Sequence, residues 1–219
     1  VSAGGEQGRD WLLTSDPVIQ SIHFDPGAPA RRLGHKVLAR ALSDIAAMGG
    51  TPHWALLDIA APGSTDESVL DDICEGVRGL ADRYDVGIVG GDLSRAPVLE
   101  IHCFAVGSVP GGSAVLRSGA RPADAILVTG ELGGSRLGRH LNFEPRVREG
   151  RWLRDYATAM IDVSDGLASD LAHLCRQSRT GASLRSGVIP ISADARRMPD
   201  EQPALQHALC DGEDFELLF

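Results

Sequence analysis

The stretch AMIDVSDGLASDL, residues 159–171, decides the fold of the second half of this chain. It begins as an apolar strand, breaks into Asp162, Ser164 and Asp165, and continues as a helix whose apolar residues recur every three or four positions. Either Ser164 or Asp165 is well placed to cap the first turn of that helix. A cap needs only one oxygen-bearing side chain, whereas this junction has three beside a glycine, so we expect it to bind a ligand as well.

Strands and helices alternate outward from this junction in both directions. Before it, the pattern predicts two extended pieces around Asp16-Pro17 in 11–24, a helix over 30–50 and a strand over 53–61. A helix over 65–85 follows, capped by Thr65 or Asp66, and then a short buried strand over 86–92 and a strand over 98–109. The last elements before the junction are a strand over 125–130 and a helical region over about 131–158. After it, the pattern predicts a strand within 182–191 and a short helix over 203–212. Such alternation is typical of a mixed α/β (α+β) protein.

The segment 110–125 is rich in glycine and proline and marks the best domain boundary. We therefore expect an N-terminal α/β domain over 1–115 and a C-terminal α/β domain over 116–219. The chain begins with Val1 and stops inside the strand-like run 215–219, so we expect both ends to be truncated.

Composition excludes several classes of function. The 219 residues, 43% hydrophobic and 23% charged, are ordinary for a globular protein with a real core. A formal charge of −9 without a lysine or arginine block argues against binding to nucleic acid or an anionic membrane. The four cysteines have no zinc-site spacing and favour reduced thiols in the cytoplasm. No stretch approaches the ~20 apolar residues of a membrane span, and no signal-peptide pattern opens the chain.

Five aspartates lie at places that suggest a metal site. Asp16 and Asp92 follow strands, and Asp162 and Asp165 lie in the strand-to-helix junction. Asp44 lies in the last turns of the 30–50 helix, where the macrodipole disfavours a negative charge by ~0.3–1 kcal/mol and a nearby cation would remove that cost. Each alone could be a turn or cap residue. Together they predict a divalent-cation site, and all-oxygen ligands suit Mg²⁺ or Mn²⁺ rather than zinc.

Other candidates are weaker and keep a structural alternative. The stretches GIVGGDLS, which contains Gly91, and TGELGGS allow backbone approach to a phosphate, but neither matches a Walker A loop and tight turns explain TGELGGS equally well. The planar guanidinium of Arg117 could bind phosphate, although a solvated surface arginine is an equal or better interpretation. His23 lies in an apolar run typical of a core or edge histidine, and its proximity to Asp16 makes a substrate contact the alternative.

The motifs together resemble one family. SIHF, LGHKVLARALSDIAAMGGTP, IVGGDLS, LRSGARPADAILVTGELG, MIDVSDGLASDL and GEDFELLF occur in this order and are similar to those of the thiamine-monophosphate kinases, in the aminoimidazole-ribonucleotide-synthetase-like superfamily. The resemblance covers residues 12–219 and implies a two-domain fold of that superfamily. It also implies transfer of the γ-phosphoryl group of ATP to thiamine monophosphate and a homodimer formed by the N-terminal domain.

The resemblance assigns roles residue by residue. Mg²⁺ around the triphosphate would be bound by five carboxylates: Asp16, Asp44, Asp92, Asp162 and Asp165. The nucleotide would contact four residues: Gly91, Asp92, Arg117 and Ser164. Asp162 and Asp165 would be the catalytic pair, with Asp165 near the acceptor phosphate or a further metal, and His23 would contact the thiamine phosphate.

The sequence departs from the family pattern in three ways. Nothing before Trp11 matches the family's paired-aspartate metal motif, and the family continues beyond GEDFELLF to a substrate-stacking aromatic. Pro17 also replaces the more usual residue after the aspartate. We therefore expect the chain as given to bind nucleotide poorly or to be inactive. Two alternatives therefore stay open: a sister ATP-using enzyme, such as aminoimidazole-ribonucleotide synthetase, selenophosphate synthetase or a hydrogenase-maturation enzyme, and a non-catalytic nucleotide-binding relative.

Overall fold

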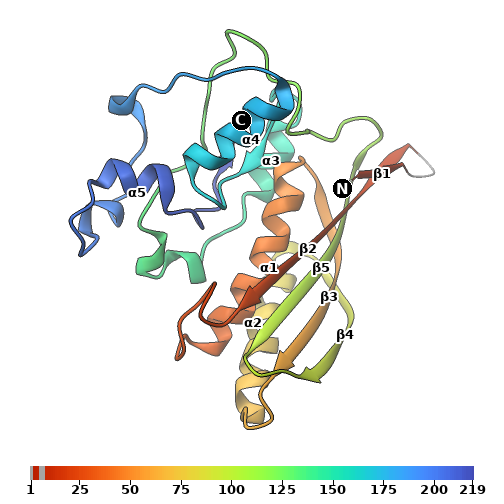
Figure 1. The fold of residues 1–219 in the computed structure, drawn as a ribbon. Coiled ribbons are helices and arrows are strands. Elements are labelled where there is room, and N and C mark those ends of the chain that lie inside the picture. Colours follow the sequence, from red (N-terminus) through yellow and green to blue (C-terminus); the bar gives the residue numbers. More distant parts are fainter. Residues whose placement is uncertain (1, 5–7) are drawn as a thin grey trace. The chain divides into compact units, whose positions relative to one another are not determined.

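The structure is a computed structural model that describes residues 2–4 and 8–219. Its contacts divide the chain into two compact units (Figure 1). Unit 1 comprises residues 1–45 and 50–112, and unit 2 comprises residues 46–49 and 113–219. Each unit has its own sheet and its own buried side chains.

Unit 1 is a five-stranded sheet with the strand order β1-β2-β5-β3-β4. Its strands are β1 Ser2–Gly4, β2 Arg9–Ile19, β3 Thr51–Ala61, β4 Gly87–Arg95 and β5 Glu100–Pro110. All neighbouring strands are antiparallel except β3 and β4. A parallel pair needs a crossover connection, and helix α2, Glu67–Tyr84, supplies it.

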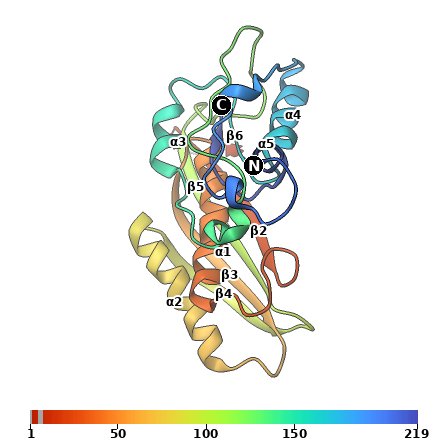
Figure 2. The ribbon, with the colours of Figure 1, turned by 90° about the vertical axis from the view of Figure 1, so that its left-hand side faces the viewer.

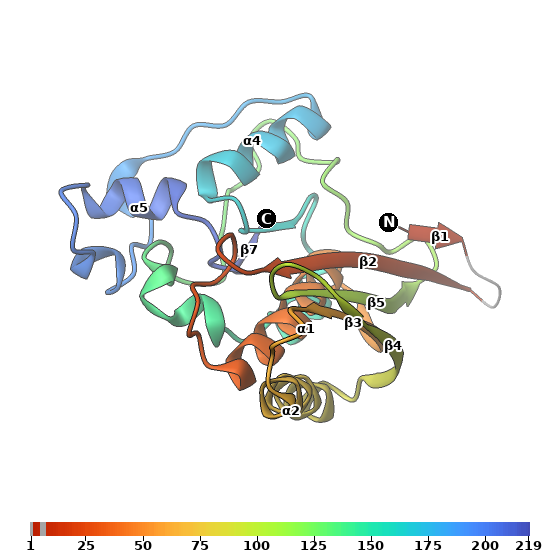
Figure 3. The ribbon, with the colours of Figure 1, turned by 60° about the horizontal axis from the view of Figure 1, so that its bottom comes forward.

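Helices α1, Ala30–Ala47, and α2 lie on the same face of this sheet (Figure 3). The predicted apolar stripe of α1 is confirmed, because Leu33, Val37 and Ile45 are all buried. The two helices approach closely at two glycines: a Cβ on Gly34 would lie 1.9 Å from the Ile73 carbonyl oxygen, and one on Gly76 would lie 1.9 Å from a backbone oxygen of α1. Only glycine permits this helix crossing.

Three expectations for unit 1 need correction. Strand β2 runs unbroken through Asp16-Pro17, because β1 pairs only with residues 10–12 and Pro17 therefore lies where β2 has β5 as its one neighbour. Strand β4 is exposed along its whole length, not buried, because it is the edge of the sheet. Asp66 occupies the N-cap position of α2 but makes no side-chain cap bond.

Unit 2 contains three helices and a small antiparallel sheet (Figure 2). Its elements are α3 Val147–Leu153, β6 Ile161–Asp162, α4 Leu167–Ser178, α5 Ala204–Cys210 and β7 Leu217–Leu218. Helix α4 contacts α5 and both strands. The core of this unit includes Leu132, Val163 and Leu174, so α4 buries its predicted apolar face against the sheet.

The strand-to-helix change in 159–171 and the helix in 203–212 are confirmed. The helical region over 131–158 is largely wrong, because positive φ angles at Gly133, Gly134 and Gly138 interrupt it and leave 3-10 helices before α3. Segment 182–191 has a 3-10 helix and one isolated bridge where a strand was expected. Segment 125–130 has one isolated bridge and backbone hydrogen bonds to 217–219, so it pairs like a strand for a short distance only.

Two expectations from composition can be compared with the structure. All four cysteines are free, as predicted. Within residues 2–4 and 8–219, no helix has both the length and the apolar character needed to span a membrane.

Candidate functional site

The structure brings together two of the predicted metal ligands, Asp16 and Asp44, in unit 1. Asp16 lies on β2 opposite Cys103 of β5, and Asp44 lies in the last turn of α1. Thr14 donates a hydrogen bond to Asp44, and Arg40 Nη2 donates to Asp16 Oδ1 at 3.3 Å. The side chain of Asp16 is 20% exposed. A strand and a helix therefore hold two carboxylates side by side.

The electrostatics of this pair fit a divalent cation. The pKa of Asp16 is raised to about 6, mainly by burial and next by the Asp44 carboxylate, while the Arg40 guanidinium opposes both effects. Two neighbouring carboxylates repel each other, and a cation between them would relieve both the repulsion and the cost of burial. Their oxygen atoms are the ligands that Mg²⁺ prefers.

Two further predicted site residues, Gly91 and Asp92, lie on β4, elsewhere in the sheet of unit 1. Asp92 pairs in register with Asp58 of β3, on the face away from the helices, whereas Asp16 faces α1. Gly91 has a structural reason to be glycine, because a Cβ there would lie 1.9 Å from the carbonyl oxygen of Leu57. The nucleotide contacts of Gly91 and Asp92 stay predictions.

His23 lies in a tight turn at the end of β2. Its backbone N–H donates to the Ile19 carbonyl oxygen at 2.9 Å, and the Ile19 N–H donates to His23 Nδ1 at 3.0 Å. Since Nδ1 accepts this hydrogen bond, the proton of the neutral ring is assigned to Nε2. The half-buried imidazole therefore has a defined orientation and an N–H donor.

In unit 2, the junction of β6 and α4 carries Asp162, Ser164 and Asp165. Asp162 is 3% exposed and lies on β6, while Ser164 and Asp165 lie in the connecting loop. The prediction that Ser164 or Asp165 caps α4 is wrong, because Gly166 occupies the N-cap position and no side chain caps the helix there. The backbone N–H groups of Ser164 and Asp165 each donate to Asp170 Oδ2, at 3.0 Å.

Asp170 is a residue that the sequence interpretation missed. It is 1% exposed, and burial raises its pKa to about 6, against the two N–H groups that lower it. The sequence signal that could have found it is an acidic residue in the first turn of α4, whose side chain can reach back to the backbone N–H groups before the helix. Because Asp170 uses the loop N–H groups, the junction can offer a ligand its side-chain oxygens rather than those amides.

The motif GEDFELLF holds the same junction from the other side. Glu213 N–H donates to the Ser164 carbonyl at 2.8 Å, and Val163 exchanges backbone hydrogen bonds of 2.8 Å with Phe215 and Glu216. Gly212 has a φ of 71°, and a Cβ on it would lie 2.5 Å from the Ser164 carbonyl oxygen. The two motifs therefore form one tightly packed support for Ser164 and Asp165.

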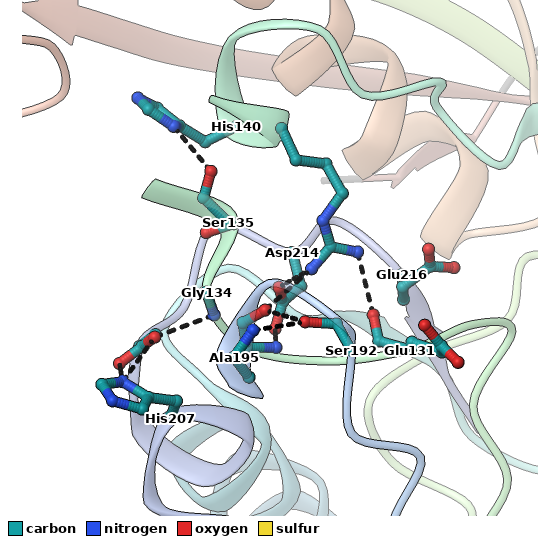
Figure 4. Close-up of polar contacts among 12 residues, drawn as sticks. Glu131, Gly134, Ser135, His140, Ser192, Ala195, His207, Asp214 and Glu216 are labelled. Carbon is teal, nitrogen blue, oxygen red and sulfur yellow. Dashed lines mark hydrogen bonds and ion pairs between the residues drawn. The ribbon is translucent and has the colours of Figure 1, made fainter. Parts of the chain in front are cut away.

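The glycine-rich stretch TGELGGS binds carboxylates of its own chain (Figure 4). Gly133 N–H donates to Asp214 Oδ2 at 2.8 Å, and Gly134 N–H donates to Asp211 Oδ2 at 2.9 Å. Arg139 Nη2 donates to Asp214 Oδ1 at 2.7 Å. Burial raises the pKa of Asp214 to about 7, while the Gly133 N–H and Arg139 oppose that shift. The tight-turn interpretation of this stretch is therefore favoured.

Two further ionic groups support unit 2. His207, 2% exposed, has Nδ1 3.0 Å from Asp211 and Nε2 3.0 Å from Asp200, and the hydrogen bond to Asp211 is the main reason why its pKa is raised (Figure 4). Arg146 binds Glu216 through two hydrogen bonds, of 2.6 and 2.8 Å. The sequence interpretation missed both groups, although His207 and Asp211 are four residues apart at the end of α5, whereas Arg146 and Glu216 are far apart in the chain.

The remaining predicted residue of unit 2, Arg117, has an exposed side chain, and its carbonyl oxygen accepts a hydrogen bond of 3.2 Å from Ser178. Throughout residues 2–4 and 8–219, no group of three or more His, Cys, Asp or Glu side chains is arranged to hold a metal ion. The pair Asp16–Asp44 belongs to unit 1, and Asp162 and Asp165 belong to unit 2. The metal-binding roles of these four residues stay predictions.

The sheet of unit 1 and its acidic pair define a class of proteins. Residues 3–109 match the family model described as AIR synthase related protein, N-terminal domain. This match confirms the predicted superfamily fold.

More specific relatives cover nearly the whole chain. The thiamine-monophosphate kinase of Escherichia coli (strain K12) is 38% identical over 94% of this chain and 70% of that protein. The thiamine-monophosphate kinase of Rhodopirellula baltica is 43% identical over 100% of this chain and 70% of that protein. A solved structure, AaThiL complexed with AMPPCP and TMP, has a TM-score of 0.94 at 29% identity and covers 100% of this chain and 77% of that one. The chain therefore belongs to the thiamine-monophosphate kinase family.

Proposed function

We propose that this protein transfers the γ-phosphoryl group of ATP to the phosphate of thiamine monophosphate and releases ADP and thiamine diphosphate. The observation that carries the proposal is the similarity, over the whole chain, to a structure complexed with AMPPCP and TMP. The Asp16–Asp44 pair supports it, because a reaction between two polyanions needs cation-binding carboxylates.

The chemistry requires positioning and charge neutralisation more than covalent catalysis. Donor and acceptor are both phosphates, and the attacking atom is already an ionised oxygen, so no nucleophilic side chain is needed. Mg²⁺, when bound, would neutralise charge on the triphosphate and orient it. In unit 1 the residues that would hold Mg²⁺ are Asp16 and Asp44, with Asp92 as the third predicted ligand.

The junction of unit 2 carries the other proposed ligands. Asp162 and Asp165 are its proposed metal-binding and catalytic carboxylates, and Ser164 is its proposed nucleotide contact, together with Gly91 and Arg117. Asp170 and the GEDFELLF motif hold this loop in one conformation, which lowers the entropic cost of binding. His23, with its proton on Nε2, is the proposed donor to the thiamine phosphate.

The proposal includes a homodimer formed through the sheet of unit 1. The face opposite α1 and α2 exposes four large apolar side chains: Leu13 (47%), Trp54 (44%), Leu56 (42%) and Phe104 (40%). An exposed apolar patch of this kind is typical of an interface, and a second copy would cover it. Sedimentation of the wild type and of Phe104→Glu tests this: a dimer and a weakened dimer are expected, and a monomeric wild type contradicts the proposal.

The cytoplasm is the proposed location. The four free cysteines suit a reducing compartment, and the related kinases come from bacteria.

The decisive experiment is an assay of ADP and thiamine diphosphate with ATP, Mg²⁺ and thiamine monophosphate, with omission of each component and with EDTA as controls. Product that requires all three components supports the kinase. A folded protein that binds ATP without forming product would favour a sister enzyme with another acceptor or a non-catalytic relative.

A further inference from the structure

Lys36 of α1 is buried completely, with an exposed fraction of 0%. Transfer of an ammonium group from water to the protein interior costs several kcal/mol unless strong hydrogen bonds compensate. Most other buried positions of α1 are apolar, Leu38 and Leu42 among them, and Lys36 is the one position of the helix where a long cationic side chain is fully buried. An apolar side chain at position 36 would avoid the cost, so the presence of lysine calls for a specific contact.

One such contact is with the turn that carries His23. Lys36 Nζ donates a hydrogen bond to the His23 carbonyl oxygen at 2.6 Å. A charged donor at this distance forms one of the stronger hydrogen bonds found in proteins. The buried ammonium therefore ties the turn to α1.

The turn itself is short and closely bonded. The Ser21 N–H donates to the Phe24 carbonyl at 2.8 Å, and the Gln20 N–H donates to the Leu99 carbonyl at 3.0 Å. Ser21 has a φ of 66°, a conformation that costs a residue other than glycine free energy. Such a turn keeps its shape only where surrounding contacts hold it, and Lys36 supplies a charged one.

The direction of the imidazole depends on this backbone. His23 Nδ1 accepts the Ile19 N–H at 3.0 Å, which leaves the proton of the neutral ring on Nε2. The ring therefore has one edge toward the protein backbone and one N–H as a donor. A fixed N–H donor is suited to the oxygen of a phosphate.

We propose that Lys36 is a positioning residue: its buried ammonium holds the 19–24 turn so that His23 Nε2–H can bind the phosphate of the acceptor substrate. This inference rests on the proposed function and adds to it a buried residue that contacts no substrate itself.

The first test is Lys36→Met, with Leu38→Met as the matched control on the same helix. Methionine approximates the volume of lysine, and the substitution removes both the cost of burying the ammonium and its hydrogen bond to the His23 carbonyl, so the melting temperature should change little. We expect the KM for thiamine monophosphate to increase about tenfold, as for loss of a charged hydrogen bond, with the KM for ATP unchanged. An unchanged KM for thiamine monophosphate, or an equal rise for both substrates, overturns the proposal.

The second test is a double-mutant cycle with His23→Gln. If Lys36 acts through His23, Lys36→Met should add little to the effect of His23→Gln. Full additivity contradicts the proposal. If Lys36→Met does not fold, Lys36→Gln takes its place in the same cycle.

A third measurement needs no activity. Hydrogen exchange at the amides of Ile19, Ser21 and His23 should be faster in Lys36→Met than in Leu38→Met, with exchange in β5 unchanged. Equal exchange in the two variants overturns the proposal. A wild type that does not phosphorylate thiamine monophosphate contradicts the proposed function, and the exchange data then decide on the Lys36 contact alone.

Discussion

The Asp16–Asp44 pair of unit 1 and the acidic segment Asp211–Glu216 of unit 2 are both groups of carboxylates with little exposure, but they differ in what surrounds them. At Asp16, burial is the largest cause of the raised pKa, and the neighbouring carboxylate of Asp44 raises it again. At Asp214, burial is also the largest cause, but the next influence is the Gly133 N–H, which lowers the pKa.

The comparison separates two uses of a buried carboxylate. In the acidic segment, three carboxylates have donors of their own: Gly134 for Asp211, Gly133 and Arg139 for Asp214, and Thr129 and Arg146 for Glu216. These groups stabilise the fold. In the acidic pair, two carboxylates share one arginine and one hydroxyl, and their mutual repulsion favours a cation. Acidic composition alone does not distinguish the two uses.

The largest expected effect comes from the acidic pair. Asp44→Asn should lower turnover on the order of 100-fold or more, because the proposed Mg²⁺ would supply several kcal/mol of charge stabilisation. The melting temperature should stay or rise, since the substitution removes a repulsion. Steady-state kinetics and thermal unfolding measure the two quantities, with Asp71→Asn on the exposed face of α2 as the control. Normal turnover in Asp44→Asn would mean that the Asp16–Asp44 pair, like the acidic segment, only stabilises the fold.

The next effect concerns the acidic segment. Arg146→Gln leaves the carboxylate of Glu216, 6% exposed, without its bidentate partner. The arginine side chain is itself 31% exposed, so we expect the free energy of unfolding to fall by about 2 kcal/mol, less than for a fully buried pair. Denaturant unfolding measures this, and Arg146→Gln/Glu216→Gln should recover part of the loss. If Arg146→Gln changes the KM for ATP without changing stability, Glu216 belongs with the functional carboxylates.

A smaller effect tests the support between the two motifs of unit 2. Gly212→Ala should destabilise the protein by about 1–2 kcal/mol, because the φ of 71° disfavours alanine and its Cβ would lie 2.5 Å from the Ser164 carbonyl oxygen. Gly112→Ala is the matched control, with a φ of 74° and nothing within 4 Å of the added Cβ. Thermal unfolding of both variants isolates the contact. Equal losses would mean that backbone conformation alone accounts for Gly212.

The smallest effect is a pH dependence at His207. Its pKa is raised in the folded protein, so the stabilisation by Asp211 and Asp200 is fully present below pH 6.5 and is lost as the pH rises through the folded-state pKa. His207→Gln should therefore lose about 1 kcal/mol more at pH 6 than at pH 9. Urea unfolding at both pH values measures the difference. A larger loss at pH 9 would reverse the assigned sign.

Sequence pattern predicted most of the elements that bury one apolar face. The stripe of α1 and the change from strand to helix in 159–171 were predicted because period and turn residues are local properties. The segments 131–158 and 182–191 were predicted wrongly because their apolar residues contact elements distant in the chain, as in the bridge between Leu132 and Ile191. The sequence did not predict that β2 is continuous, because a strand can include a proline such as Pro17 only where no neighbouring strand needs its missing N–H, and the neighbours are set by the tertiary structure.

Motif order by itself determined the family of this protein and the residue types that could bind cations and phosphates. Only the tertiary structure decided which carboxylates repel each other, which accept hydrogen bonds from Gly133, Gly134 and Asp165, and that Lys36 is buried against the turn of His23. The physical reason is that the charge state and role of a side chain depend on burial and on partners brought close by folding, and neither is a property of local sequence.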